Sequence, residues 1–510
     1  MTLTCTTIVE PKLDEMILAA YAAQEIGTDL IELRLDYLEK IDLFELLPIK
    51  EEVSVRLIAT LRPQIEGGQF SGAESDRFEL LEECIESEIF DFIDCELSSE
   101  QTSLEDLIDV ARAKGVKTIV SHHDLEGTPT SSEFIEILNK CLALGDIAKI
   151  GVTVKSRTDF SNFLAGCRTA WEAEHNFTGV CLNGAASYIS RILAPHIGSW
   201  AVYASLTPEK KAVPEQITLL QLKNAWKAMA VDPSAQSELN FVDEHTKIYG
   251  LLGQSLAYTH SPLMHNAAFK SEHLESIYIP FDIPQDLLGQ IINDSRTLNI
   301  SGLNVTIPFK ESVMEYLDEL DEGASKINAV NTIVNSEGVL KGYNTDSYGA
   351  MQALKSANIE PKEKKVMVFG AGGAAKALCF GLISEGASVS VANRTEARAA
   401  ELKALYPEIE VVDFQARNEA VTKHDIIINC TPTGTAGFDA DDIFDYNNIN
   451  NDHTVFDLVY NPRKTKLLEA AEQKGAKIVS GIDMLLHQAL KSFKIWTDIN
   501  IEADLMRSSL

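Results

Sequence analysis

Residues 364–377 read KKVMVFGAGGAAKA, which is a β-rich run, a turn with three glycines and the start of a helical segment. Three further β-rich runs follow: SVSVANR from Ser388, DIIINC from Asp425 and VFDLVY from Val455. Strand, glycine turn, helix and strand in this order are typical of the start of a Rossmann fold. The glycines let a pyrophosphate approach the N–H groups at the start of the helix. A tight turn without a ligand is the alternative interpretation.

The residues after the run at Ser388 indicate which dinucleotide binds. An NAD site usually places Asp or Glu there, to bind the ribose hydroxyls. This chain has Asn393, Arg394 and Thr395, and Arg398 follows. Two guanidinium groups and a hydroxyl suit a 2′-phosphate, so the sequence predicts NADP. The backbone contacts to the pyrophosphate are expected from Gly370, Gly372, Gly373 and Ala374.

The remainder of the chain predicts a second α/β domain before the Rossmann fold. A polar stretch, VDPSAQSELNFVDEH, occupies 231–245 without a sustained apolar period, so we expect a linker there. Residues 1–230 are the predicted first domain. After the linker we expect a lobe of residues 246–345, completed by the C-terminal helical segment 484–510, and a Rossmann lobe of residues 346–483.

Eight short β-rich runs alternate with helical patterns in the first domain. They are LTCTTIVE, LIELRLD, RLIATLR, FDFIDCEL, VKTIVSHHD, DIAKIGVTV, FTGVCLNG and WAVYASL. The spacing between runs leaves room for one helix and two turns each. Eight such units predict an α/β fold of the (β/α)₈ barrel type. Glu32 and Arg34 make the second run unusual for a buried strand.

Composition excludes several classes of protein. The formal net charge is −32, and such a surface repels the phosphates of nucleic acids. The sequence has no apolar run of about 18 residues, so no membrane span is predicted. The eight cysteines form no CxxC pair, which favours reduced thiols over a zinc site, and no metal is expected. These features predict a cytoplasmic protein; a plastid location stays open if a transit peptide has been removed.

Polar residues lie in or just after the barrel runs, where barrels of this type place their chemistry. They are Glu32, Arg34, Arg62, Glu96, His123, Lys149, Arg191 and Gln216. Lys149 lies between Ala148 and Ile150, where desolvation lowers a lysine pKa and yields the neutral amine that forms a Schiff base. A lysine that extends past the strand end to solvent is the alternative. His123 can act as acid and base, and Glu96 is expected to orient it.

The pieces IELRLD, TLRPQIEGG, IDCEL, SHHDLEGTP, DIAKIGV, SRILA and PEQIT resemble type I 3-dehydroquinate dehydratases over nearly all of residues 1–225. The resemblance implies that Lys149 forms the imine, that His123 is the general acid and base and that Glu96 is its partner. It implies substrate contacts from Glu32, Arg34, Arg62, Arg191 and Gln216. The chain departs from the family where AVPEQ replaces the usual SAPGQ, so Ala212 supplies no hydroxyl, and at Asn183, where the family has methionine.

The pieces GQSLAYTHSPLMHN, GLNVTIPFKE, INAVNT, GYNTD, VFGAGGAAKA, DLVYNP and HQA resemble shikimate dehydrogenases from Lys247 to about Gln488. The resemblance implies a two-lobed dehydrogenase with Lys310 and Asp346 as the catalytic pair. It implies substrate contacts from Thr259, Ser261, Asn304, Thr306, Asn331, Tyr460 and Gln488. Considered alone, Lys310 and Asp346 could be a structural ion pair.

Taken together, the two resemblances imply consecutive reactions on small molecules. 3-Dehydroquinate is dehydrated to 3-dehydroshikimate, which is then reduced to shikimate with NADPH. Three alternatives stay open: quinate as the substrate of the second half, a different lysine-imine enzyme such as an aldolase, and a weakened or non-catalytic first half. The sequence does not give the oligomeric state.

Overall fold

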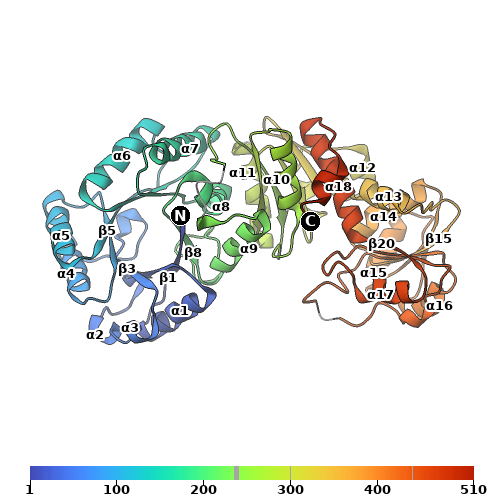
Figure 1. Cartoon of the computed structure of the whole chain (residues 1–510), viewed down its shortest axis with the longest axis horizontal. Coiled ribbons are helices and arrows are strands. Elements are labelled where there is room, and N and C mark those ends of the chain that lie inside the picture. The colour runs from blue at the N-terminus through green and yellow to red at the C-terminus, as the bar shows by residue number, and fades with distance from the viewer. Residues whose placement is uncertain (235–239, 299, 439) are drawn as a thin grey trace. The chain divides into compact units, whose positions relative to one another are not determined.

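The computed structural model describes residues 1–510 apart from 235–239, 299 and 439. The chain divides into two compact units: Met1–Lys247 with Gln290–Asn299, and Ile248–Gly289 with Ile300–Leu510. Figure 1 labels their helices and strands along the chain. In the described residues, no helix combines the length and apolar character needed to cross a membrane.

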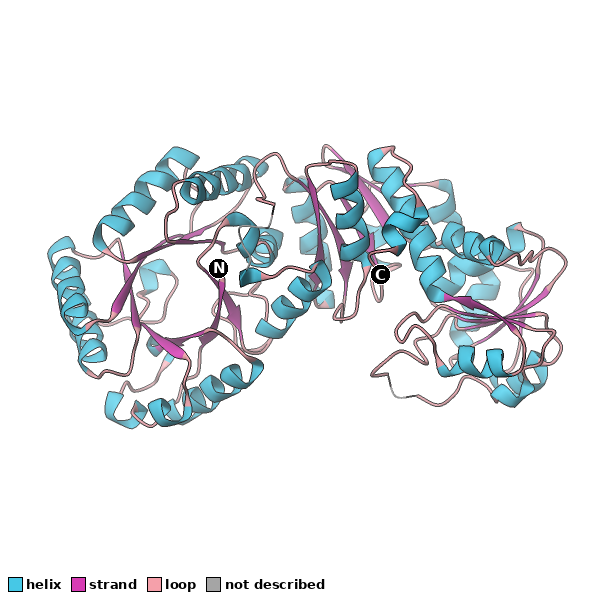
Figure 2. Ribbon diagram, in the orientation of Figure 1, coloured by secondary structure: helices cyan, strands magenta, loops and turns pink. Residues whose placement is uncertain are grey.

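The first unit contains a parallel eight-stranded sheet, and each predicted run supplies one strand. The strands are β1 (Leu3–Ile8), β2 (Leu30–Arg34), β3 (Arg56–Thr60), β4 (Phe92–Glu96), β5 (Lys117–Asp124), β6 (Ile147–Val152), β7 (Phe177–Cys181) and β8 (Ala201–Ser205). Their order is β7-β6-β5-β4-β3-β2-β1-β8. The Trp200 N–H donates to the Phe177 carbonyl (2.6 Å) and so joins the two end strands. Figure 2 shows the strands as a ring enclosed by helices, which confirms the predicted barrel.

Helices follow the strands around the barrel. They are α1 (Leu13–Ile26), α2 (Leu43–Leu46), α3 (Ile49–Glu52), α4 (Glu74–Glu86), α5 (Gln101–Lys114), α6 (Ser131–Leu144), α7 (Arg157–Glu172), α8 (Gly184–Ile192) and α9 (Leu219–Met229), with 3₁₀ segments η1 (Leu35–Tyr37), η2 (Gln64–Glu66) and η3 (Ala194–Ile197). Two of the starts are fixed by capping boxes, Thr130 with Glu133 at α6 and Thr218 with Gln221 at α9.

Side-chain alternation along the strands places the polar residues together inside the barrel. Leu30, Phe92, Ile119 and Ile147 belong to an apolar cluster that fills one end of the barrel. Side chains two residues apart share a strand face. The residues two positions further on, Glu32, Asp94, Ser121 and Lys149, therefore share that inner face nearer the carboxyl ends of their strands. The same two-residue alternation thus places both the apolar cluster and the polar site inside the barrel.

The predicted linker packs on the first unit where the structure describes it. Residues 235–239 of the predicted range lie outside the described residues. The Val242 N–H donates to the His196 carbonyl (2.9 Å), and the ring of Phe241 lies 4.9 Å from that of Trp171, centroid to centroid. The polar composition of the stretch therefore did not reveal two residues that bury apolar surface.

The second unit begins with a mixed six-stranded sheet. Its strands are β9 (Lys247–Gly253), β10 (Ser276–Asp282), β11 (Gly302–Val305), β12 (Glu319–Leu320), β13 (Thr332–Ser336) and β14 (Val339–Tyr343), in the order β10-β9-β11-β13-β14-β12. The helical segments of this part of the chain are α10 (Ser261–Ser271), η5 (Gln285–Leu287), α11 (Leu288–Thr297), η6 (Ser312–Tyr316) and α12 (Glu322–Ile327). The C-terminal helices α18 (Gly481–Thr497) and α19 (Ala503–Arg507) add Phe493 and Met506 to the core that contains Tyr249 and Met264.

A parallel six-stranded sheet forms the rest of the unit. Its strands are β15 (Lys365–Phe369), β16 (Ser388–Ala392), β17 (Glu410–Val411), β18 (Ile426–Asn429), β19 (Thr454–Asp457) and β20 (Lys477–Ser480), and its helices are α13 (Asp346–Ser356), α14 (Gly373–Ser384), α15 (Glu396–Leu405), α16 (Arg417–Val421) and α17 (Lys466–Gln473), with η7 (Phe414–Ala416) and η8 (Tyr446–Asn448). The order β17-β16-β15-β18-β19-β20 is that of a Rossmann fold, as the glycine turn predicted.

Candidate active sites

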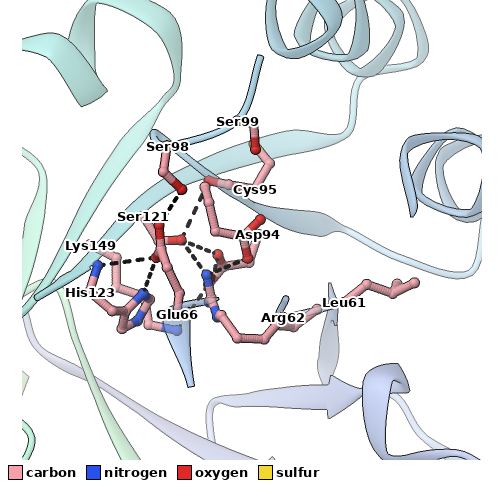
Figure 3. Close-up of polar contacts among 12 residues, drawn as sticks. Leu61, Arg62, Glu66, Asp94, Cys95, Ser98, Ser99, Ser121, His123 and Lys149 are labelled. Carbon is pink, nitrogen blue, oxygen red and sulfur yellow. Dashed lines mark hydrogen bonds and ion pairs between the residues drawn. The ribbon is translucent and has the colours of Figure 1, made fainter. Parts of the chain in front are cut away.

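Lys149 lies inside the barrel and is only 5% exposed. Its Nζ is 2.9 Å from Asp94 Oδ2 and 3.1 Å from Glu32 Oε1, and it lies 3.8 Å from the ring centroid of Tyr203. Figure 3 shows Lys149 with Asp94, Ser121 and His123 in one group. The sequence placed this amine among apolar neighbours, and the structure adds two carboxylates at hydrogen-bonding distance. The alternative of a lysine in bulk solvent is wrong.

The carboxylates around Lys149 are held in their ionised form. Burial raises the pKa of Glu32, but Lys149 and Arg34 outweigh it, and the net pKa is lower than usual. Burial likewise raises the pKa of Asp94, while Arg62 and Lys149 lower it well below its ordinary value. The Ser121 hydroxyl also donates to Asp94 Oδ1 (2.6 Å). The negative charges of the buried carboxylates are therefore compensated by cationic side chains of the same site.

His123 faces a carboxylate that the sequence did not single out. Its Nδ1 lies 2.9 Å from Glu66 Oε2, and its backbone N–H donates to the same oxygen (3.1 Å). Burial and the nearby Arg62 lower the pKa of His123 to about 4, against the opposing effect of Glu66. At neutral pH the imidazole is therefore uncharged. Because an ionised Glu66 accepts the Nδ1 proton, Nε2 is left as the base.

Glu96 does not contact His123, contrary to the prediction from the sequence. Its Oε1 binds Arg62 Nη1 (2.6 Å), and its Oε2 binds Arg77 Nη1. Glu96 is the last residue of β4, and its carboxylate points to two guanidinium groups. Glu66 in η2 lies beside β5, so its carboxylate contacts His123 instead. Burial raises the pKa of Glu96 to about 7, and the two arginines oppose this shift.

The other barrel residues predicted to bind substrate fall into two groups. Arg62 belongs to the network of Lys149, since its Nη2 is 2.8 Å from Asp94 Oδ1. Arg34, Arg191 and Gln216 bind other groups. Arg34 pairs with Asp36 through two 2.8 Å contacts. Arg191 donates to the carbonyls of residues 203 (3.1 Å) and 181 (2.9 Å), and burial lowers its pKa to about 10. Gln216 accepts from the Ala212 N–H (3.0 Å).

Asn183, one of the departures from the family pattern, has a structural contact in this protein. Its side-chain Oδ1 accepts from the Val154 N–H and its Nδ2 donates to the Val154 carbonyl, both at 2.8 Å. The amide therefore ties the loop after β7 to the segment after β6. This pairing is one that a methionine side chain cannot make.

In the second unit, Lys310 and Asp346 form a close pair. Lys310 Nζ lies 2.5 Å from Asp346 Oδ2, and the side chains are 15% and 5% exposed. Asn331 Nδ2 donates to Asp346 Oδ1 (2.8 Å) and so fixes the other carboxylate oxygen. A Cβ built on Gly373 would be 3.3 Å from Lys310 Cβ, which places the start of α14 directly beside this lysine.

Polar side chains extend from this pair into the first sheet of the unit. Asn331 also approaches Gln488 Oε1 (3.4 Å), and the Tyr278 hydroxyl donates to Asn304 Oδ1 (2.8 Å). Asn304 Nδ2 donates to Ser492 Oγ (3.1 Å). The structure thus brings together Lys310, Asp346, Asn331, Asn304 and Gln488.

The remaining predicted substrate contacts come from three segments of the chain: Thr259 and Ser261 at the start of α10, Tyr460 after β19 and Thr306 after β11. Thr259 Oγ1 accepts from the Ser261 N–H (3.3 Å), so these two residues meet at the start of α10. The ring of Tyr460 lies 5.9 Å from that of His260, centroid to centroid. Thr306, after β11, approaches Gly253 through its Cγ2, because a Cβ built on Gly253 would lie 2.5 Å from it.

The glycine turn has the geometry that a pyrophosphate needs. Gly370 has φ 111°, and a Cβ at this position would lie 3.2 Å from the Cys430 carbonyl. A Cβ on Gly372 would meet open space, so the backbone before α14 is accessible. Gly373 and Ala374 supply the first N–H groups of α14. The residues present therefore fit a dinucleotide.

The end of β16 presents cationic side chains to solvent. Arg394, Thr395 and Arg398 are exposed, and Asn393 Nδ2 donates to the Thr395 carbonyl (2.8 Å). Within the residues that the structure describes, neither arginine has an ion-pair partner. Two unpaired guanidiniums at this position fit a 2′-phosphate. In the same residues, no cluster of three or more His, Cys, Asp or Glu side chains could hold a metal.

Comparison with known proteins assigns each region to a family model. Residues 4–233 match type I 3-dehydroquinase, and 251–333 match the shikimate dehydrogenase substrate-binding domain. Residues 352–479 match shikimate/quinate 5-dehydrogenase, and 481–510 match the C-terminal domain of shikimate 5′-dehydrogenase. The bifunctional, chloroplastic 3-dehydroquinate dehydratase/shikimate dehydrogenase of Arabidopsis thaliana is 31% identical over 99% of this chain and 83% of its own length. The chain belongs to this bifunctional family.

Two relatives resemble the dehydrogenase half alone. The NADP⁺ shikimate dehydrogenase of Halothermothrix orenii is 42% identical over 51% of this chain and 94% of its own. The crystal structure of shikimate dehydrogenase from Aquifex aeolicus is 37% identical, covers 52% of this chain and 97% of its own, and gives a TM-score of 0.50. The second half of this member of the bifunctional family therefore has the dimensions of a complete single-function dehydrogenase.

Sequence reasoning missed several polar residues of the two sites. Asp94 stands two positions before Glu96, so the two-residue period of a strand places both on one face and could have revealed it. Glu66 lies four residues beyond Arg62 in the short 3₁₀ segment η2, which is too short to show a period. Thr345 and Ser492 join the second site through a mutual 3.1 Å contact, and their hydroxyls carry no distinct signal in the sequence.

Proposed function

We propose that this chain catalyses two consecutive reactions of the shikimate pathway: dehydration of 3-dehydroquinate to 3-dehydroshikimate, and reduction of that product to shikimate with NADPH. The observation that carries the proposal is the similarity of 99% of the chain to one bifunctional enzyme. The contacts of Lys149 and of Lys310 agree with it, because Lys149 is buried and Lys310 is half-buried, each beside the groups that its reaction needs.

In the first reaction, the amine of Lys149 attacks the ring ketone of 3-dehydroquinate. The carbinolamine that forms takes up a proton and loses water to give an iminium. The iminium withdraws electrons and makes the adjacent C–H acidic. His123 Nε2 removes that proton, since burial keeps the imidazole uncharged at neutral pH. Glu66 orients the ring and stabilises its charged form.

The elimination is completed by the same imidazole. The β-hydroxyl of the substrate leaves as water after protonation by His123, and hydrolysis of the imine releases 3-dehydroshikimate and regenerates the Lys149 amine. Glu32 and Asp94 hold the nitrogen in place through the cycle. Arg62, Arg34, Arg191 and Gln216 are our proposed contacts for the carboxylate and hydroxyls of the substrate.

In the second reaction, Lys310 is the proposed acid. It stabilises the negative charge that develops on the carbonyl oxygen of 3-dehydroshikimate and donates its proton to that oxygen. Asp346 orients the lysine, and Asn331 orients Asp346. Asn304, Thr306 and Gln488 are proposed contacts for the ring hydroxyls, and Thr259, Ser261 and Tyr460 for the carboxylate.

NADP fits the glycine turn and the cationic end of β16. When bound, NADPH supplies the hydride that reduces the carbonyl carbon. We propose that Gly370, Gly372, Gly373 and Ala374 bind the pyrophosphate through their backbone, and that Asn393, Arg394, Thr395 and Arg398 bind the adenosine ribose and its 2′-phosphate.

We further propose the domain limits set out above: a dehydratase barrel at 1–230, a linker at 231–245, a substrate lobe at 246–345 with 484–510, and a cofactor lobe at 346–483. The cellular location is proposed as the cytoplasm. A plastid is the alternative, because the Arabidopsis relative is chloroplastic.

A coupled assay tests the proposed function directly. The chain is supplied with 3-dehydroquinate and NADPH, and the absorbance of the reduced nicotinamide is followed. We expect the absorbance to fall only when both are present, with shikimate as the product. If NADPH were oxidised with added 3-dehydroshikimate but not with 3-dehydroquinate, only the proposed dehydrogenase activity of the second half would stand.

Quinate is a second candidate substrate for the dehydrogenase half. Thr259 stands where the family usually has serine, and its methyl group changes the shape of the proposed carboxylate site. Reduction of NADP⁺ with shikimate and with quinate, compared as kcat/KM, separates the two substrates. We expect shikimate to be preferred.

A further inference from the structure

Six buried charged side chains form one chain of alternating sign in the barrel. Its links are Arg77–Glu96, Glu96–Arg62 at 2.6 Å, Arg62–Asp94 at 2.8 Å, Asp94–Lys149 at 2.9 Å and Lys149–Glu32 at 3.1 Å. None of the six side chains is more than 7% exposed. The chain of charges begins on a helix outside the barrel and ends at the proposed imine lysine.

Arg77 is the outer end of this chain and has no role in the proposed reaction. It extends from the first turn of α4, and its Nη1 binds Glu96 Oε2. Its Nη2 donates to Ser99 Oγ (2.9 Å), and its Nη1 lies 3.5 Å from the Leu61 carbonyl. Figure 3 shows Leu61 next to Arg62 in this group. Arg77 therefore touches both the residue before Arg62 and the carboxylate that binds Arg62.

Removal of Arg77 would leave a buried carboxylate oxygen without its cation. An uncompensated buried charge is costly, so the neighbouring groups rearrange or Glu96 takes up a proton. The Arg62 guanidinium can bind both carboxylate oxygens of Glu96 only if it gives up its contact with Asp94. Asp94 binds Lys149 through its second oxygen, so the disturbance passes to the amine.

We propose that Arg77 is a positioning residue for dehydration. By binding Glu96 Oε2 it keeps Arg62 on Asp94, and it thereby keeps Asp94 on Lys149. Arg77 itself makes no contact with Lys149 and acts through Glu96. This inference rests on the proposed dehydratase function, and an inactive wild-type barrel would refute that function before the inference is tested.

A double-mutant cycle between residues 77 and 96 tests the proposal. Arg77→Met removes the guanidinium and keeps an unbranched apolar stem. We expect kcat for dehydration to fall about 30-fold, as displaced catalytic groups typically cause. In the Glu96→Gln background the carboxylate that needs Arg77 is gone. There we expect Arg77→Met to change kcat by about 2-fold or less.

Two controls separate positioning from a general loss of structure. The NADP-dependent oxidation of shikimate by the same variants reports on the second unit and should be unchanged. Arg77→Lys keeps the positive charge and should recover most of the lost kcat. If the Met variant loses its barrel by circular dichroism, the cycle is repeated with Arg77→Gln, which also removes the charge. Equal losses of kcat in both backgrounds, or no loss in either, would overturn the proposal.

Discussion

Lys149 is the side chain on which we propose that dehydration depends, because only a primary amine can form the imine. We expect Lys149→Ala to lower kcat for dehydration about 10⁴-fold or more. Reduction with borohydride in the presence of 3-dehydroquinate should attach the substrate to the wild-type chain at residue 149, as measured by peptide mass. Lys155→Ala, a change at an exposed lysine after β6, is the control. Unchanged dehydration by Lys149→Ala would refute the assignment.

Glu66 controls the pH at which His123 becomes protonated. Burial lowers the pKa of His123 to about 4, and the Glu66 carboxylate raises it. Removal of that carboxylate in Glu66→Gln should lower the pKa further. The acid limb of kcat/KM for dehydration should therefore move to lower pH by about 1 unit, and kcat should fall because the ring is less well oriented.

The matched control for this change is Glu126→Gln, an exposed carboxylate in the loop after β5. It should leave both the pH profile and kcat unchanged. A shift of the acid limb to higher pH in Glu66→Gln would show that Glu66 does not interact with His123 as the structure indicates.

At the residue scale, the sequence could identify strand residues better than loop residues. Lys149, Glu32 and Arg62 lie in the barrel runs, and all three meet in one network. Glu66 was missed and Glu96 was given its role, because a residue in η2 can reach β5 only through a fold that no spacing encodes. Apolar neighbours of Lys149 along the strand were visible, whereas its contacts with Glu32 and Asp94 across the barrel were not.

The turn between β15 and α14 combines two glycines with different requirements. Gly370 has φ 111°, and a Cβ there would press on the Cys430 carbonyl at 3.2 Å. Gly370→Ala should therefore lower the free energy of unfolding by about 2 kcal/mol, measured by denaturant titration. Gly372 has φ −91° and open space around it, so Gly372→Ala should keep the stability.

The same pair of variants also separates stability from binding. In Gly372→Ala the added methyl lies where we expect the pyrophosphate, so the KM for NADPH should rise about 10-fold. If Gly372→Ala lost stability and bound NADPH normally, the turn would not be the cofactor site that we propose.

The residues at the end of β16 should determine whether the dehydrogenase prefers NADPH or NADH. Removal of a charge-assisted hydrogen bond costs about 1.5–3 kcal/mol, so Arg394→Ala should raise the KM for NADPH about 10-fold or more. The KM for NADH, which lacks the 2′-phosphate, should change little. Lys423→Ala, an exposed cation after α16, serves as the control. An equal rise for both cofactors would contradict a 2′-phosphate contact.

Elements were predicted where a period or a special turn marks them. The eight barrel runs and the strand–glycine–helix unit are present as predicted, because alternation and glycine are local signals. The two-residue strands β12 and β17 were not predicted, since strands of two residues carry no period. The apolar contact of Phe241 within the expected linker was missed for the same reason.

At the scale of the whole molecule, the sequence predicts two units with separate cores, and the structure contains two compact units. The polar stretch at 231–245 and the change of pattern after it indicated a division of the chain, and the domain limits themselves stay a prediction. The relative placement of the units has no local signal in the sequence. What two separate cores do imply is that each reaction can be abolished without loss of the other.

Two single-site variants test this independence. Lys149→Ala should retain NADPH-dependent reduction of added 3-dehydroshikimate, and Lys310→Met should retain dehydration of 3-dehydroquinate. Each lysine belongs to a network inside one unit, through Asp94 in the barrel and through Asp346 in the second unit. An equimolar mixture should therefore convert 3-dehydroquinate and NADPH to shikimate, because the intermediate released by one variant is the substrate of the other. The steady rate should approach that of wild type at the same concentration of intact sites, after a lag in which free 3-dehydroshikimate accumulates. If either variant lost both reactions, the two units would not act independently.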